Sequence, residues 1–186
     1  MLTERENTTE IDKRVAKVLK AVLPKESSRY ACNQVYAEQV HVYRYGRIRD
    51  ASLLTVTDGR CLLSVEVQHN LADGLYNLKD NVLFRSADNG DIFPKYREIF
   101  PDHEEPQSVG YPFLRAVLTA IIRQQYFLNL WLYEKILKAI EKLDWFYQLA
   151  FAVDVEGKIA TDRPVTLYGQ NGRNQLKAVF MPYNKG

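Results

Sequence analysis

The sequence has few cysteines and histidines, and neither residue type forms a familiar catalytic or metal-binding motif. Two cysteines, Cys32 and Cys61, occur among 186 residues. That is too few for a disulfide framework, so we expect both thiols to be reduced. The three histidines, at positions 41, 69 and 103, lack the close spacing of zinc ligands. Glycine-rich phosphate loops and serine or cysteine nucleophile motifs are also missing. Disulfide-rich, zinc-binding and P-loop proteins are therefore excluded.

The sequence also lacks a strong net charge, a long apolar run and an internal repeat. A formal net charge of +2 is too small to indicate nucleic-acid binding by itself, so any basic surface must be local. A membrane span would need an uninterrupted run of about 18 apolar residues, which is not present. The N-terminal segment carries Glu4, Glu6 and Glu10, where a secretory signal would be apolar. We therefore expect a cytoplasmic protein, not associated with membranes, that forms one domain over residues 1–186.

Two segments have the apolar spacing of well-formed helices. The first begins near Thr8 and Thr9, which can cap a helix, and ends before Pro24. Its apolar residues recur at helical spacing: Ile11, Val15, Val18, Leu19 and Val22. The second, over residues 112–143, is apolar on more than one face. It is either two consecutive helices or one long helix that packs on the sheet and on a second subunit, which makes a homodimer plausible. A weaker pattern over residues 71–84 predicts a short helix, and residues 86–110 are expected to be mostly loop.

The strands are predicted from β-branched and aromatic residues bounded by turn sequences. Residues 35–45 form a first strand. Residues 50–57 and 61–68 form a hairpin around Asp58-Gly59. The nearly continuous apolar run over 145–155 predicts a central strand. A final hairpin, from 163–168 and 176–183, turns at Asn171-Gly172.

Polar side chains with metal-binding chemistry occur in the second and third of these strands. Glu66 and Gln68 are two residues apart and therefore share one face of a strand, while Asp50 begins the preceding strand. Carboxylate oxygens of this kind suit Mg²⁺ or Mn²⁺, and such ions catalyse phosphodiester hydrolysis. The alternative is that Asp50 is a turn residue and that the other two lie on a solvated strand face.

The length of the loop at Asp58-Gly59 decides whether these side chains can meet. A two-residue loop pairs Thr57 with Arg60 and places Asp50 on the wrong face of the sheet. A three-residue loop pairs Thr57 with Cys61, so that Asp50 faces Gln68 and Ser52 faces Glu66. We predict the three-residue loop, which is common when a bulge follows the turn.

The predicted elements follow the order helix, three meandering strands, helix and strand. Arg49-Asp50 lies in the second of the three strands, and Glu66-Val67-Gln68 lies in the third. This combination resembles the PD-(D/E)XK nuclease superfamily. The match in topology covers residues 10–155, and the glutamine at position 68 is similar to that of the recombination-promoting nucleases, where most members have lysine. The resemblance implies an α+β sandwich with a restriction-endonuclease-like αβββαβ core and a mixed sheet. To this core we add the long apolar helix and the C-terminal hairpin.

The same resemblance implies roles for individual residues. Asp50 and Glu66 would hold Mg²⁺ or Mn²⁺ with the Val67 carbonyl, and Gln68 would orient the attacking water or the phosphate. Glu10 matches an additional acid of the family, although an acid at this position would also complement the dipole of the first helix.

Arginines and tyrosines alternate just before Asp50. Arg44, Arg47 and Arg49 could pair with phosphates, and the neighbouring tyrosines could stack on unpaired bases. Lys79 could extend this basic surface. The alternative is an ordinary strand end with solvated arginines.

These patterns favour a metal-dependent nuclease that hydrolyses DNA; RNA or single-stranded DNA remains an alternative substrate. The second hypothesis is a catalytically inactive, nuclease-like accessory factor that binds nucleic acid or protein, for example from a mobile element or virus. The third is an unrelated α+β interaction module. The first hypothesis requires the acids to converge, the second requires only the basic segment and a dimer face, and the third requires neither.

Overall fold

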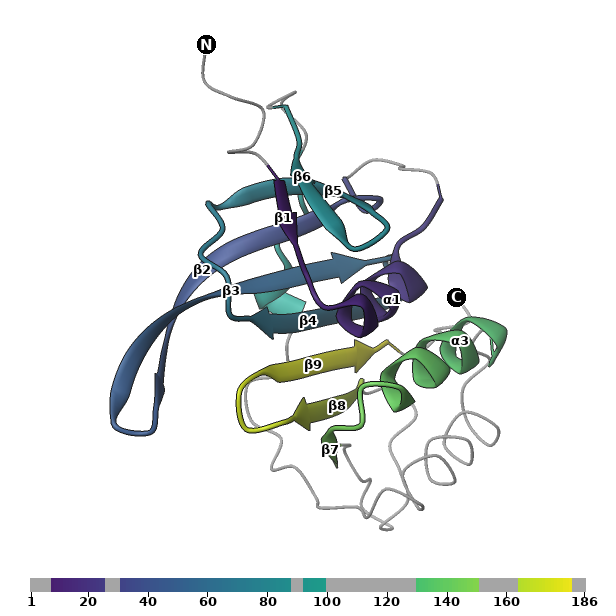
Figure 1. The fold of residues 1–186 in the computed structure, drawn as a ribbon. Helices are drawn as coiled ribbons and strands as arrows, with labels where there is room; N and C mark the ends of the chain where they lie inside the picture. The colour runs from purple at the N-terminus through teal and green to yellow at the C-terminus, as the bar shows by residue number, and fades with distance from the viewer. Residues whose placement is uncertain (1–7, 26–30, 88–91, 100–129, 151–163, 182–186) are drawn as a thin grey trace.

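The computed structural model describes residues 8–25, 31–87, 92–99, 130–150 and 164–181. These residues form one sheet of nine strands in the order β1-β6-β5-β2-β3-β4-β9-β8-β7, in which every pairing is antiparallel. Two α-helices lie side by side on one face of it (Figure 1). The strands are β1 (Thr8–Glu10), β2 (Val35–Arg44), β3 (Arg47–Thr57), β4 (Cys61–Val67), β5 (Gly74–Lys79), β6 (Val82–Arg85), β7 (Phe146–Ala150), β8 (Val165–Gln170) and β9 (Gln175–Phe180). The helices are α1 (Lys13–Val22), α3 (Leu130–Glu141) and a 3-10 helix, η2 (Tyr96–Ile99).

The sheet contains two similar units, besides β1, β5 and β6, that the sequence does not reveal as a repeat. In each unit a helix precedes a three-stranded meander: α1 precedes β2-β3-β4, and α3 precedes β7-β8-β9. The last strands of the two meanders, β4 and β9, pair with each other. The two final hairpins also turn alike, because Asp58 and Asn171 each accept hydrogen bonds from the backbone N–H groups two and three residues later.

Helix α1 follows from its amphipathic pattern and from an aspartate cap. Its predicted apolar residues are buried against the strands, and Leu23 ends the helix before Pro24 as predicted. The predicted threonine cap is wrong, because Thr8–Glu10 is strand β1, paired with β6. Asp12 caps the helix instead: its Oδ1 accepts hydrogen bonds from the backbone N–H groups of Arg14 (2.7 Å) and Val15 (3.4 Å). Partial burial acts to raise the pKa of Asp12, but these hydrogen bonds lower it overall.

Residues 71–84 are not the predicted helix but the hairpin of β5 and β6. The side chains that enter the core, Tyr76, Leu78 and Leu83, follow the period of two that a strand imposes, and Asp80, with a φ of 54°, makes the turn. The predicted strand 35–45, the hairpin of 50–57 and 61–68, and the final hairpin at Asn171-Gly172 are present as β2, β3–β4 and β8–β9.

The second half of the chain differs from the prediction in two ways. Strand β7 is the last strand of the described sheet and not a central one. Helix α3 has 12 residues, and residues 112–129 of the predicted long helix lie outside the described residues. The prediction of a homodimer through 112–143 therefore stays a prediction. In the part of the chain that the structure describes, no helix has the length and apolar character of a membrane span.

The predicted restriction-endonuclease-like αβββαβ core with a mixed sheet is wrong. That core needs the strand after the second helix to join the sheet in parallel, whereas β7 pairs antiparallel with β8. The order α1, β2, β3, β4 and then α3 matches the expected one, but β1 precedes α1 and the hairpin of β5 and β6 lies between β4 and α3. Pairing between β4 and β9, which are more than one hundred residues apart in the sequence, distinguishes the observed fold.

Candidate functional site

The two faces of the sheet have different environments. The face under α1 and α3 holds the main apolar core. The opposite face, here called the outer face, is partly covered by the segment 92–99, whose Phe93 and Tyr96 rings contact Tyr36. Next to this segment the outer face has a cavity of about 480 Å³. Its lining includes Leu53, Ser64, Glu66, Phe146, Tyr168 and Lys177.

The register of the β3–β4 hairpin places Asp50 and Glu66 on opposite faces of the sheet. Thr57 pairs with Leu62 and Leu53 pairs with Glu66, so four residues, Asp58 to Cys61, form the loop instead of the predicted three. The Oδ1 atom of Asp58 accepts hydrogen bonds from the backbone N–H groups of Arg60 (2.9 Å) and Cys61 (2.7 Å), which draws Cys61 into the turn. The additional residue shifts the pairing by one, and a shift of one moves every side chain to the other face.

The predicted partners of a metal ion are each engaged elsewhere. Asp50 Oδ1 lies 2.9 Å from His41 Nδ1, on the face that carries the helices. Glu10 is in β1, where its Oε1 accepts a hydrogen bond of 2.7 Å from Asn81 Nδ2. Glu66 Oε2 is paired with Arg44. The described segments contain no group of three or more His, Cys, Asp or Glu side chains that could hold a metal ion. The predicted Mg²⁺ or Mn²⁺ site at Asp50 and Glu66 is therefore wrong.

Glu66 is instead the buried centre of a polar cluster on the outer face. Its Oε2 accepts a hydrogen bond of 2.8 Å from Arg44 Nη2, and its Oε1 accepts one of 3.1 Å from Gln68 Nε2. The residue is only 3% exposed. Burial raises the pKa of the Glu66 carboxyl, while the Arg44 charge and the Gln68 hydrogen bond oppose that rise. Both carboxylate oxygens thus have a hydrogen-bond partner, which explains how a carboxylate is accommodated in this buried position.

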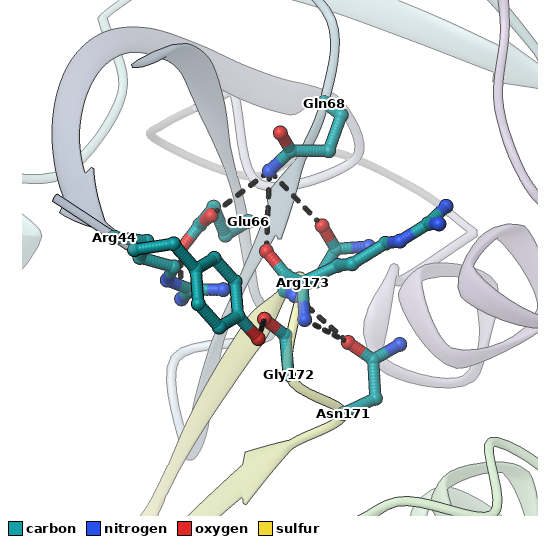
Figure 2. Close-up of polar contacts among 8 residues, drawn as sticks. Arg44, Glu66, Gln68, Asn171, Gly172 and Arg173 are labelled. Carbon is teal, nitrogen blue, oxygen red and sulfur yellow. Dashed lines mark hydrogen bonds and ion pairs between the residues drawn. The ribbon is translucent and has the colours of Figure 1, made fainter. Parts of the chain in front are cut away.

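This cluster fastens the tip of the β2–β3 hairpin to the β8–β9 turn (Figure 2). Gln68 Nε2 also lies 3.2 Å from the carbonyl oxygen of Arg173 and 3.2 Å from Asn174 Oδ1. Tyr45, at the hairpin tip, donates a hydrogen bond of 2.8 Å from its hydroxyl to the Gly172 carbonyl. We call this set of contacts the latch: Arg44, Tyr45, Glu66, Gln68 and residues 171–174. Three of its members have other roles than the sequence predicted: Arg44 was expected to bind phosphate, Glu66 to hold a metal ion, and Gln68 to orient the attacking water or the phosphate.

The basic residues singled out in the sequence occupy three different environments. Arg44 is turned into the latch, with a side chain only 18% exposed. Arg47 and Arg49 are exposed on β3, on the same side of the hairpin as Arg44. Lys79 is exposed at the end of β5. Binding of nucleic acid by these four residues remains a prediction.

A basic stripe on α1 was missed by sequence reasoning. The helix exposes Lys13, Arg14 and Lys17 to solvent, with Lys20 half-buried on the same side, and every other residue of the helix is buried. The signal was present in the sequence KRVAKVLKAV, where every position between the buried ones is cationic. Arg14 is paired with Asp12 at 3.5 Å. No described acid forms an ion pair with the three lysines.

Comparison with known proteins identifies the fold. No protein-family model and no curated protein matches the sequence. The DNA polymerase III beta subunit of Thermotoga maritima superposes with a TM-score of 0.56 at 15% identity, covering 97% of this chain and 66% of that one. A DNA polymerase sliding clamp of Pseudomonas aeruginosa superposes with a TM-score of 0.54 at 11% identity, covering 96% of this chain and 67% of that one. The chain thus has the fold of about two thirds of a sliding clamp. The predicted resemblance to PD-(D/E)XK nucleases is wrong.

Proposed function

We propose that this chain is a DNA-binding accessory protein without nuclease activity, and that helix α1 provides its main contact with duplex DNA. In this role the chain binds DNA and does not hydrolyse it, as in the second of the hypotheses drawn from the sequence. The fold supports it, since the similar solved structures are named as DNA polymerase subunits and clamps. The observation that carries it is the basic stripe of α1, which consists of Lys13, Arg14, Lys17 and Lys20.

The charges of α1 oppose the stability of the helix itself. Lys13 and Arg14 occupy the first turn, where the positive end of the helix dipole disfavours cations, and that turn contains no acid. Lys13 and Lys17 are four residues apart, and Lys17 and Lys20 three apart, so their like charges repel along one side. Each such pair costs about 0.2–0.5 kcal/mol. Asp12 at the N-cap offsets part of this, but its carboxylate pairs with Arg14, and no described acid pairs with the three lysines. An anionic partner at the lysines would remove their mutual repulsion.

Phosphate groups are the partners that this geometry fits. A helix rises about 1.5 Å per residue, so the stripe from Lys13 to Lys20 extends roughly 10 Å, long enough to meet more than one phosphate. Lysines that neutralise phosphates release the condensed counterions of the duplex. Such binding is strongly salt-dependent and independent of base sequence, which suits an accessory protein that must work at any site on DNA.

Fluorescence anisotropy with a short labelled duplex tests this proposal. The double substitution Lys13→Gln/Lys17→Gln should weaken binding and reduce the slope of log K against log salt by about 1.8, since each phosphate contact contributes about 0.9. The matched control is Lys95→Gln/Lys142→Gln, which removes the same charge from two exposed lysines outside α1. Little change is expected in the control. Equal losses in both variants, or no binding of duplex by the wild-type chain, would overturn the proposal.

A further inference from the structure

The end of the β2–β3 hairpin is a two-stranded ribbon that extends beyond the rest of the sheet. Pairing of β2 with β5 stops at Ala37, and pairing of β3 with β4 stops at Ser52. Beyond these residues β2 and β3 pair only with each other, and Figure 1 shows the ribbon extending past the end of β4. We call residues 41–50 the arm. A two-stranded hairpin is marginally stable by itself, so the latch is what holds the arm in place.

The arm exposes large apolar side chains to solvent. Tyr43 is 74% exposed, Tyr45 is 76% exposed and Ile48 is 71% exposed. Tyr43 and Ile48 are directly opposite each other across the two strands. Arg47 and Arg49 are exposed on the other side of the ribbon, close to the tip. The arm therefore combines aromatic surface with positive charge within a few residues of the turn.

Tyr45, at the tip of the arm, is a residue type that this kind of turn disfavours. Tyr45 and Gly46 have φ values of 51° and 74°, the left-handed conformation of a two-residue hairpin turn. Asparagine, aspartate or glycine is preferred at the first of these positions, and a bulky side chain there is strained. Strain of this kind is common where a side chain serves in binding. The hydroxyl of Tyr45 is fixed on Gly172, while most of its ring surface faces solvent.

We infer that the arm binds an unpaired strand of nucleic acid, which stacks its bases on Tyr43 and Tyr45 and pairs its phosphates with Arg47 and Arg49. The inference rests on the proposed DNA binding and adds a second site for a different form of the ligand. A strand that crosses the tip meets Tyr43 on one side, Tyr45 at the turn and the arginines on the other. Tyrosine faces accept any base, and arginines follow the backbone.

Charge favours this occupant over an apolar protein surface. The arm contains three arginines and one acid, Asp50, whose carboxylate lies against the His41 imidazole at 2.9 Å. Glu66 neutralises Arg44, which leaves Arg47 and Arg49 against Asp50, and this excess positive charge is complementary to phosphate. Its exposed apolar residues include two tyrosines, whose planar rings suit stacking, and a single aliphatic residue, Ile48.

The test compares two side chains of the arm that have the same exposure but different chemistry. Binding of a labelled single-stranded DNA oligonucleotide to the full chain is measured by anisotropy for Tyr43→Ala, Tyr43→Phe and Ile48→Ala. Tyr43→Ala should weaken binding about five-fold or more, because one stacked base is lost. Tyr43→Phe should retain the wild-type affinity, since the aromatic face remains. Ile48→Ala should have little effect.

The outcomes separate this inference from the proposed function. Equal losses for Tyr43→Ala and Ile48→Ala would mean that the arm makes a general apolar contact, which overturns base stacking. Single-stranded binding that is lost in Lys13→Gln/Lys17→Gln and unchanged in Tyr43→Ala would place the strand on α1 and also overturn the inference. In either case duplex binding through α1 would be unaffected. Failure of the proposed function appears instead as loss of duplex binding in the wild-type chain.

Discussion

Arg44 on β2 and Glu66 on β4 form an ion pair of 2.8 Å across the strand that separates them. Strand β3 lies between these two strands, so the end of the β2–β3 hairpin must curl over the outer face for the guanidinium to reach the carboxylate. The side chains are only 18% and 4% exposed, which distinguishes this pair from the exposed ion pairs elsewhere on the described surface.

Removal of Arg44 should destabilise the chain strongly. Arg44→Gln leaves the buried Glu66 carboxylate without its cation, and breaking one side of a buried pair costs about 3 kcal/mol or more. Urea unfolding of the variant at neutral pH measures the loss. The double variant Arg44→Gln/Glu66→Gln should recover much of it, because no buried charge remains. A double variant as unstable as Arg44→Gln would contradict the assignment of this loss to an uncompensated charge.

Glu66 should make the stability of the chain depend on pH in a defined direction. Burial raises the pKa of its carboxyl above the usual value of 4.5 despite Arg44 and Gln68. The folded state therefore holds the proton more tightly than the unfolded state, and this contribution to stability is complete below pH 4.5 and lost as pH rises through the folded pKa. The free energy of unfolding of the wild type relative to Glu66→Gln should thus increase as pH falls from neutral towards 4.5. A decrease in that interval would show that the folded pKa is lowered.

Two glycines in matching turns offer a test of the latch. Gly59 and Gly172 have φ values of 83° and 80°, so an alanine at either position should cost about 1–2 kcal/mol in urea unfolding. Only at Gly172 does an added methyl group meet the arm, 3.3 Å from the Tyr45 hydroxyl; nothing lies within 4 Å at Gly59. Trypsin should therefore cleave Gly172→Ala faster than Gly59→Ala at Arg47 and Arg49. Equal rates of cleavage in the two variants would mean that the Tyr45–Gly172 contact does not restrain the arm.

Divalent cations should not bind at the residues once predicted to hold them. Asp50 and Glu66 lie on opposite faces of the sheet, and Glu66 has both oxygens occupied by Arg44 and Gln68. We expect calorimetric titration with Mn²⁺ to give the same result for the wild type, Asp50→Ala and Glu66→Gln. Heat of binding that disappears in both variants would restore the metal site.

Local features of the fold were predictable from the sequence because they depend on neighbouring residues. The buried side of α1 follows from apolar spacing, and the end of that helix follows from Pro24. The turns at Asp58-Gly59 and Asn171-Gly172 follow from residues that adopt positive φ or cap their own turn. The basic side of α1 could also have been predicted, because the positions that the apolar pattern leaves on the solvent side are all lysine or arginine.

The candidate site depended on two facts that no local pattern contains. One is the number of residues in the β3–β4 loop: a difference of one residue, set by the hydrogen bonds of Asp58, decides whether Asp50 shares a face with Glu66. The other is the pairing of β4 with β9, which brings the β8–β9 turn up to Gln68 over a separation of more than one hundred residues. The residues of the sequence thus determined the elements and their chemistry. Their tertiary pairing decided that Arg44, Glu66 and Gln68 form a latch, because a carboxylate's role is set by which partners reach it.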